Sequence, residues 1–157
     1  MSAETITTAI FLITAVVATA VLVNAIYPVI YSTAGTFQSS THDADTRLRT
    51  DFKIVANFKN ASSNGYDVYM KNIGSQRISL DEIKKADVFC GLTAGNRLSY
   101  GSDGWTANII STDKSYWNTG ETLAVYANGC GGGTGNTIYF QFILTNGIWR
   151  SIEFPAS

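Results

Sequence analysis

The first 41 residues of this chain contain almost no charge. Glu4 is the only Asp, Glu, Lys or Arg among them, and every Lys and Arg of the chain lies at Arg47 or later. The whole chain nevertheless has 15% charged residues and a net charge of -1, so the average hides two physically different parts. A near-neutral chain without a run of Lys and Arg does not attract nucleic acid electrostatically, and we expect no nucleic-acid partner.

Histidine and cysteine are also scarce. The single histidine, His42, cannot form a His-based metal cluster or a catalytic relay within one chain. The two cysteines, Cys90 and Cys130, are not in a C-x-x-C arrangement, which argues against zinc binding and redox catalysis. We therefore predict no catalytic residue, no metal site, no cofactor and no enzymatic activity.

Two interpretations of the cysteines stay open. In an extracellular domain, Cys90 and Cys130 would form a disulfide that closes a loop of roughly 40 residues, worth about 4 kcal/mol in the chain-entropy account. Two buried thiols are the alternative.

Two short motifs carry little chemistry. The glycine-rich run 128–135 lacks the Gly-Lys-Ser/Thr ending of a phosphate-binding loop and lies between two predicted strands, so we interpret it as a surface loop. Asn60-Ala61-Ser62 matches the N-glycosylation acceptor and falls in a predicted turn, which makes Asn60 a candidate glycosylation site.

The charge-free part contains a long apolar segment. Residues 6–27 are rich in Ile, Leu, Val, Ala and Phe, and about 22 helical residues extend roughly 33 Å, enough to cross a hydrocarbon core of about 30 Å. We predict a transmembrane or filament-core helix over 1–31, with Pro28 bending or ending the span. A cleaved signal peptide lacks support because no basic residue precedes the segment, and a buried core helix would be shorter and less apolar.

The same helix has features of filament-forming subunits. In pilins and archaellins, apolar helices pack together, and a Glu near the N-terminus meets the terminal amine of a neighbour, a place that Glu4 occupies here. Small residues one turn apart, Thr14 with Ala18 and Ala15 with Thr19, would let helices approach closely. We therefore predict a homo-oligomer assembled through this helix. The alternative is that Ala and Thr are simply common in membrane helices and Glu4 flanks the span.

The rest of the chain follows a different pattern. Residues 32–50 are interpreted as a linker or helix extension, and residues 51–157 as a β domain in which apolar and polar side chains alternate. Asn146-Gly147 is a strong hairpin signal, because both residues tolerate positive φ. We predict a helical turn at 80–85 and about eight strands, at 52–59, 66–70, 86–91, 96–100, 105–110, 121–127, 137–144 and 148–154.

So many short strands, spaced 8–12 residues apart, predict an antiparallel β-sandwich. We expect Trp105, Trp117 and Trp149 in its core.

Several segments along the chain carry a resemblance to a known family. They are Ser2-Ala3-Glu4, Ile26-Tyr27-Pro28, residues 42–56, Met70-Lys71-Asn72-Ile73-Gly74-Ser75, residues 86–89, residues 116–123, residues 139–142 and residues 146–150. Together they extend over nearly the whole chain and resemble the FlaG family of accessory proteins of the archaellum, the archaeal flagellum.

The resemblance implies a fold, a location and partners. The family's helix is anchored in the cytoplasmic membrane without a pilin-type leader, and its immunoglobulin-like β-sandwich lies outside, beneath the surface layer. Such proteins assemble through their helices into a short pilin-like filament. With the partner FlaF, they tie the rotary motor to the surface layer as part of the stator. The expected partners are thus a second copy of the chain, a FlaF-like protein, the surface layer and the membrane.

Two other functions remain as alternatives. A pilin- or archaellin-like filament subunit normally carries a basic leader, whereas this sequence begins at Met1 directly before the apolar helix. A membrane-tethered sugar- or adhesin-type sandwich would bind through accessible loops such as 91–105 and 128–136.

Overall fold

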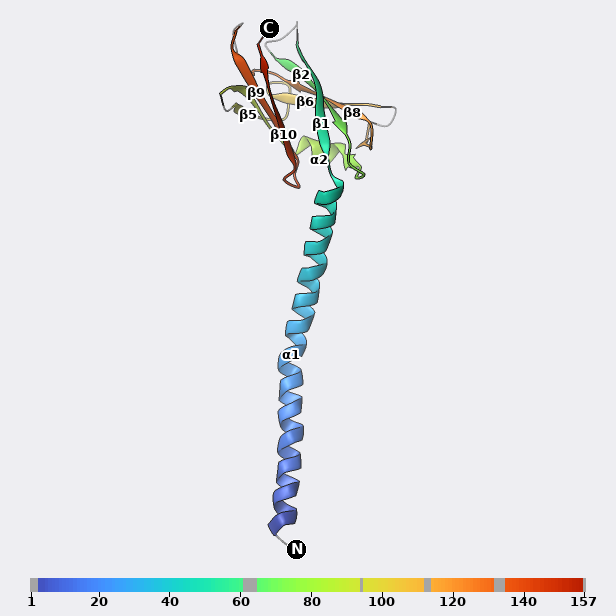
Figure 1. Ribbon diagram of the computed structural model, residues 1–157, viewed down its shortest axis with the longest axis vertical. Helices are drawn as coiled ribbons and strands as arrows, with labels where there is room; N and C mark the ends of the chain where they lie inside the picture. Colours follow the sequence, from blue (N-terminus) through green and yellow to red (C-terminus); the bar gives the residue numbers. More distant parts are fainter. Residues whose placement is uncertain (1–2, 61–64, 94, 112–113, 132–134, 157) are drawn as a thin grey trace. The chain divides into compact units, whose positions relative to one another are not determined.

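The computed structural model describes residues 3–60, 65–93, 95–111, 114–131 and 135–156 of the chain. Its contacts divide the chain into two units, residues 1–43 and residues 44–157. Figure 1 shows the helices and strands along the sequence. They are α1 Ala3–Arg49, β1 Phe52–Lys59, β2 Tyr66–Asn72, β3 Ile78–Ser79, α2 Leu80–Lys84, β4 Asp87–Leu92, β5 Asn96–Leu98, β6 Trp105–Ile110, β7 Tyr116–Trp117, β8 Thr122–Ala127, β9 Thr137–Ile143 and β10 Trp149–Pro155.

Helix α1 is one continuous element and contains both the apolar span and residues 32–49. Pro28 does not end it. A proline inside a helix removes one backbone hydrogen bond, here the one to the carbonyl of Asn24, but the turns on both sides keep theirs. The following turn is reinforced, because the hydroxyls of Ser32 and Thr33 donate to the carbonyl of Val29 at 3.0 and 2.7 Å.

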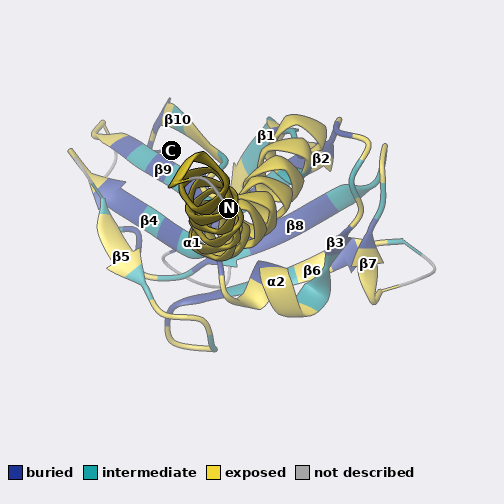
Figure 2. Cartoon of the chain, turned by 90° about the horizontal axis from the view of Figure 1, so that it is seen from below, coloured by how far each residue is buried: buried dark blue, intermediate teal, exposed yellow. Residues whose placement is uncertain are grey.

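Within the described ranges, the β domain consists of two four-stranded antiparallel sheets and one short pair. The first sheet has the order β1-β2-β8-β6 and the second the order β10-β9-β4-β5, while β3 pairs with β7. The four-stranded sheets enclose the hydrophobic core, and strand β8 is dark blue along most of its length in Figure 2. The predicted antiparallel sandwich is thus present.

Aromatic side chains occupy the centre of this core. The ring of Phe52 lies 5.9 Å from that of Trp117 and 5.6 Å from that of Phe142, and Trp105 contacts Phe142 at 5.9 Å. Burying each large apolar side chain contributes about 1.5–3 kcal/mol. The prediction for Trp149 is wrong, since its side chain is 51% exposed. Trp149 is the first residue of the edge strand β10 and lies on the outer face of the sheet, where its indole ring is exposed to solvent.

The predicted alternation in β1 fails after its first half. The pairing with β2 shifts by one residue between Ile54 and Ala56, which marks a β-bulge. A bulge reverses the faces of the residues that follow it. Phe58, expected on the same face as the buried Phe52, is consequently 60% exposed and contacts Tyr69 instead, at 5.8 Å between rings.

The hairpin between β9 and β10 is correctly located, but its turn differs from the expected one. Leu144 pairs with Ile148, and the amide of Gly147 donates to the carbonyl of Leu144 at 2.9 Å. Gly147 has a φ of +82°, whereas Asn146 is not among the described residues with positive φ. The connection is therefore a three-residue loop ending in a left-handed glycine, in place of a two-residue turn. Asn146 contributes through its side chain, which accepts from the amide of Ile148 at 3.1 Å.

Candidate functional site: an uncovered helix and the clamp at its end

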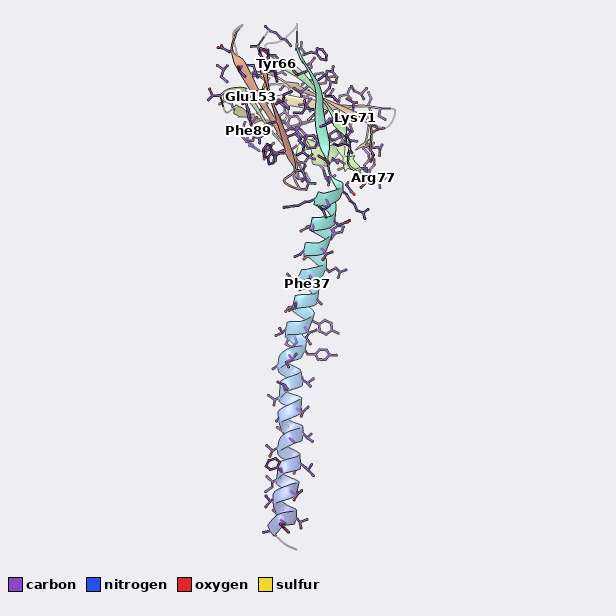
Figure 3. All side chains as sticks on the ribbon, in the orientation of Figure 1. Phe37, Tyr66, Lys71, Arg77, Phe89 and Glu153 are labelled. Carbon is purple, nitrogen blue, oxygen red and sulfur yellow. A yellow bond between two sulfur atoms is a disulfide. The ribbon has the colours of Figure 1, made fainter. Side chains whose placement is uncertain are left out.

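Helix α1 presents apolar side chains around its whole circumference (Figure 3). None of its residues, all of which the structure describes, is buried, and Phe11 and Val16 are 78% and 69% exposed. Among the described residues, it is the one helix long and apolar enough to cross a membrane. Such a surface is unfavourable in water, and soluble monomers rarely expose apolar patches of this size.

The threonines of α1 do not make it polar. In the apolar span, four threonine hydroxyls donate to the carbonyl four residues earlier: Thr7 to Ala3 at 2.9 Å, Thr8 to Glu4 at 2.7 Å, Thr14 to Ile10 at 2.8 Å and Thr19 to Ala15 at 2.8 Å. Each hydroxyl thus satisfies its donor within the helix, so the threonine is tolerated in lipid or between helices.

Two of the predicted assembly residues line a shallow groove along α1. Ala15 and Thr19 form part of its floor because their side chains are short. Larger residues on either side form its walls, and the full lining is Leu12, Ala15, Val16, Thr19, Ala20, Val23 and Asn24. A second depression nearer the N-terminus shares two of these residues and is lined by Thr7, Thr8, Phe11, Leu12 and Ala15. The two depressions form one continuous apolar stripe.

The other predicted assembly residues lie elsewhere. Thr14 and Ala18 do not line the groove, because each residue of a helix is rotated by about 100° from the one before. They share a neighbouring face of α1. Glu4 lies in the first turn and is exposed. The roles of all five residues in assembly stay predictions.

The end of α1 belongs to the β unit, which begins at residue 44. The loop after β2 closes around the point where the helix becomes β1. The amides of Ile73 and Gly74 both donate to the carbonyl of Asp51, at 3.0 and 2.8 Å, and the amide of Gln76 donates to the carbonyl of Arg49 at 3.1 Å. These backbone bonds, with the side chains described below, form what we call the clamp.

Gly74 allows the clamp to close. A Cβ atom at this position would lie 2.3 Å from the carbonyl oxygen of Arg49 and 2.5 Å from the backbone nitrogen of Asp51. Both distances are shorter than any real Cβ contact, and both atoms belong to backbone that cannot easily move. The absence of a side chain is therefore a requirement of the approach.

Buried Asn72 holds the loop in its conformation. Its side-chain amide donates to the carbonyls of Gln76 at 2.9 Å and Trp117 at 3.0 Å, and its side-chain oxygen accepts from the amide of Gly74 at 3.0 Å. The hydroxyl of Thr119 donates to the carbonyl of Gly74 at 2.7 Å. Because Asn72 is fully buried, the three hydrogen bonds of its side chain avoid the penalty of a buried polar group without a partner.

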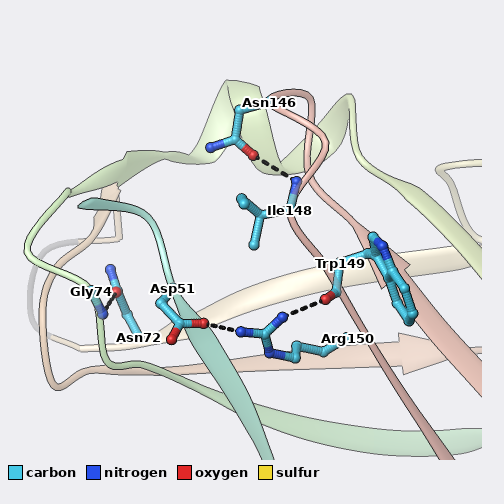
Figure 4. A network of polar contacts seen from close by, with 7 residues as sticks. All are labelled: Asp51, Asn72, Gly74, Asn146, Ile148, Trp149 and Arg150. Carbon is cyan, nitrogen blue, oxygen red and sulfur yellow. Dashed lines mark hydrogen bonds and ion pairs between the residues drawn. The ribbon is translucent and has the colours of Figure 1, made fainter. Parts of the chain in front are cut away.

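Strand β10 of the second sheet also contacts the junction between α1 and β1. Arg150 at the start of β10 forms an ion pair with Asp51, and its guanidinium also donates to the carbonyl of Trp149 at 2.8 Å (Figure 4). Both partners of the ion pair are more than a third exposed, so it adds only a little stability and mainly fixes geometry. The junction between α1 and β1 is thus tied to both sheets.

Two other predicted positions have clear surroundings. Cys90 in β4 and Cys130 form a disulfide, and both are buried. The side-chain amide of Asn60 donates to the carboxylate of Asp67 at 3.1 Å. Ala61 and Ser62, which complete the glycosylation motif, lie outside the described residues, so glycosylation of Asn60 stays a prediction.

The clamp was not found from the sequence. Residues 71–75 lie outside every strand and helix predicted from the sequence, and the hydrogen bond from Asn72 to Trp117 joins residues that no local pattern connects. The one available signal was the quoted segment Met70–Ser75, which the resemblance singled out without saying what it does.

Comparison with known proteins gives both a family and a fold. The family model described as archaeal-type flagellin matches residues 2–154. An uncharacterized protein of Archaeoglobus fulgidus is 31% identical over 129 residues, which cover 80% of each chain.

Three solved structures share the fold. The archaellum periplasmic stator protein FlaG of Sulfolobus acidocaldarius is 19% identical with a TM-score of 0.54, covering 67% of this chain and 99% of that one. A chain of the FlaF and FlaG stator complex from the same organism is 21% identical with a TM-score of 0.52, covering 66% and 87%. The archaeal flagellum of Methanospirillum hungatei strain JF1 is 15% identical with a TM-score of 0.68, covering 97% and 93%.

These likenesses confirm the predicted immunoglobulin-like sandwich preceded by an apolar helix. Since the family model spans nearly the whole sequence, the chain belongs to the archaeal-type flagellin family and is an archaellum-related protein.

Proposed function

We propose that this protein is a non-enzymatic structural component of the archaellum, anchored by α1 in the cytoplasmic membrane with its sandwich outside, beneath the surface layer. In this role it holds the motor against the surface layer as part of the stator. The observation that carries the proposal is the combination of an uncovered apolar helix with a clamp that ties the junction of α1 and β1 to both sheets. A stator component must connect a membrane element to an outer domain, and the clamp secures the end of α1 within the unit that contains the sandwich.

Lipid or sister helices are the natural covering of α1. Burying its side chains in a hydrocarbon environment removes apolar surface from water, at about 25 cal/mol per Å². The groove at Ala15 and Thr19 supports close approach of a second copy, in the way that small residues bring membrane helices together. Homo-oligomerisation through α1 is therefore part of the proposal.

The groove can be tested against its neighbouring face. Replacing Ala15 and Thr19 by leucine fills the groove, while replacing Thr14 and Ala18 by leucine adds the same kind of bulk one face away. We expect the first pair to reduce the assembled mass in detergent, measured by light scattering after size exclusion, and the second pair to leave it unchanged. Equal masses for both variants would rule out the groove as the contact.

The outer partners are proposed from the relatives. The Sulfolobus complex joins FlaG with FlaF, and the similarity of its fold supports a FlaF-like partner for the sandwich of this chain. The expected result is co-purification of the full chain with the FlaF homologue of its own cell, and the surface-layer protein should join them. Recovery of neither protein would contradict the proposed partners.

A second function has specific support. The Methanospirillum flagellum matches 97% of this chain, α1 included, whereas the Sulfolobus FlaG structure matches 67%. A filament subunit, in an extracellular or adhesive fibre, is therefore the competing candidate.

Deleting the gene in its host distinguishes the two functions. A stator component predicts that the deleted cells still carry filaments but do not swim, and that the protein is found in membranes and not in sheared filaments by quantitative mass spectrometry. Loss of the filaments, together with abundant protein in sheared filaments of the parent cells, would contradict the stator and support the subunit.

A further inference from the structure

A polar crevice opens on the outer face of the sheet β10-β9-β4-β5. Its volume is about 370 Å³, within the ~300–1,000 Å³ range of small-ligand sites. Three strands contribute to it, at the end of β4, the start of β9 and the second half of β10. The lining residues are Leu92, Thr93, Asn136, Thr137, Tyr139 and Glu153.

The strand register explains why the surface is hollow here. Tyr139 pairs with Glu153 on one side and with Gly91 on the other, so these three residues form one row across the sheet. The neighbouring residues Ile138 and Phe154 are buried in the core, which places Tyr139 and Glu153 on the outer face, where Glu153 is labelled in Figure 3. Gly91, the third residue of this row, has no side chain, so space remains beside the ring of Tyr139.

Covalent and backbone links hold the rim of the crevice. The disulfide joins Cys90, next to Gly91, to Cys130 in the loop before β9. On the other side, the amide of Ala156 donates to the carbonyl of Asn136 at 2.7 Å, which fixes that residue beside the end of β10. Gly91, Cys130 and Asn136 lie in the loops 91–105 and 128–136 through which the sugar- or adhesin-type alternative would bind. Residues 94 and 132–134 of these loops are outside the described ranges.

Thr93 at the rim has an unusual backbone. Its φ of +64° is the only positive value for a described residue other than glycine. A β-branched residue in the left-handed region is a genuine outlier, with a strain of about 1–3 kcal/mol, and such strain tends to occur at functional positions.

The polar side chains of the crevice form no hydrogen bonds within the described part of the chain. Within the part of the chain that the structure describes, the carboxylate of Glu153, the amide of Asn136 and the hydroxyls of Thr93, Thr137 and Tyr139 have no hydrogen bond or ion pair to other side chains or backbone. The carboxylate of Asp87 in the same sheet, by contrast, is paired with Arg97. Convergent polar groups without internal partners are available to a ligand.

The chemistry of these groups selects the ligand class. The described lining contains no Lys, Arg or His, so nothing in it attracts a phosphate or another anion. Its one carboxylate falls short of the six to eight oxygens that calcium takes, several of them usually from carboxylates. A carboxylate, an amide, hydroxyls and an aromatic ring together suit the hydroxyl groups and the apolar face of a sugar.

We propose that this crevice binds a neutral saccharide unit. The Glu153 carboxylate accepts hydrogen bonds from two sugar hydroxyls, the Asn136 amide and the threonine hydroxyls contact others, and the ring of Tyr139 covers an apolar patch of C–H groups. The site does not depend on the stator or on the filament function, since the argument for it uses only the residues that line the crevice.

The test uses the full chain in a zwitterionic detergent without a sugar headgroup, so that the detergent does not compete. The probes are the methyl glycosides of glucose, mannose, galactose and N-acetylglucosamine, observed by saturation-transfer NMR and titrated for affinity. We expect at least one to bind, with its affinity reduced at least tenfold by Glu153→Gln, which removes hydrogen bonds to a charged group, and similarly by Tyr139→Ala.

Matched controls come from elsewhere on the domain. Tyr126→Ala removes a half-buried tyrosine from the outer face of the other sheet, and Asp103→Asn neutralises another exposed carboxylate. Both should retain the affinity of the parent. The proposal is overturned if none of the probes binds, if Glu153→Gln binds as tightly as the parent while remaining folded by tryptophan fluorescence, or if the controls lose as much affinity.

Discussion

Both regions of this molecule are rich in apolar side chains, but only one of them buries its own. Phe11 in α1 is 78% exposed, while Phe52, three residues after the end of the same helix, is fully buried between the two sheets. The sandwich buries many large hydrophobic side chains in its own core. Helix α1 leaves the same kind of residue for lipid or for other helices to cover, so its stability depends on its surroundings.

The three tryptophans of the chain all lie in residues 44–157. Tryptophan fluorescence of the full chain therefore reports on the sandwich alone, and far-ultraviolet circular dichroism reports on α1 as well.

The largest effect is expected from the centre of the sandwich. Phe52→Ala removes a ring that contacts Trp117 and Phe142, and should lower the free energy of unfolding by about 3–5 kcal/mol. Phe58→Ala makes the same change in the same strand, at a position that is 60% exposed, and should cost about 1 kcal/mol or less. Denaturant titration followed by tryptophan fluorescence measures both. Similar losses would mean that the bulge in β1 is absent.

Removing the disulfide is next in size. Replacing Cys90 and Cys130 together by alanine opens a link between residues 40 apart and should cost about 4 kcal/mol or somewhat less, because the unfolded chain gains entropy. The helical signal of α1 should not change. The same fluorescence titration measures this loss. Adding a reducing agent to the parent opens the disulfide by a second route and should lower the free energy of unfolding by a similar amount. If the reducing agent leaves the free energy of unfolding of the parent unchanged, the two cysteines are free thiols.

Replacing one glycine in each region by alanine compares the two regions directly. Gly74→Ala forces a Cβ against the backbone of Arg49 and Asp51, and should destabilise the sandwich by about 1–3 kcal/mol. Gly35→Ala, with nothing within 4 Å, should leave the sandwich unchanged and favour the helix by up to about 1 kcal/mol. Thermal unfolding followed by both signals separates the two outcomes. A sandwich indifferent to Gly74→Ala would show that the clamp does not close.

The sequence predicted the parts of this fold that depend on local patterns. The apolar helix follows from residues 6–27, and the hairpin of β9 and β10 follows from alternation around Asn146-Gly147. The short helix α2 over Leu80–Lys84 agrees with the predicted turn at 80–85. Each of these signals lies within a few residues of the structure that it predicts.

The features that were missed depend on distant partners. The bulge in β1 is defined by its register with β2, and the short pair β3–β7 joins Ile78 to Trp117 across the chain. Gly74 and Asn72 have meaning only because the end of α1 lies against their loop. Trp149 was assigned to the core by its size, although its place on an edge strand decides its exposure. No local pattern contains this information.

The most direct test of the whole account compares the intact chain with a chain of residues 44–157, both without detergent. Size exclusion with light scattering should find the shorter chain as a folded monomer, since it keeps the clamp and the sandwich, and the intact chain as large assemblies or as a precipitate. A monomeric, soluble intact chain would contradict the claim that α1 must be covered by lipid or by its own copies.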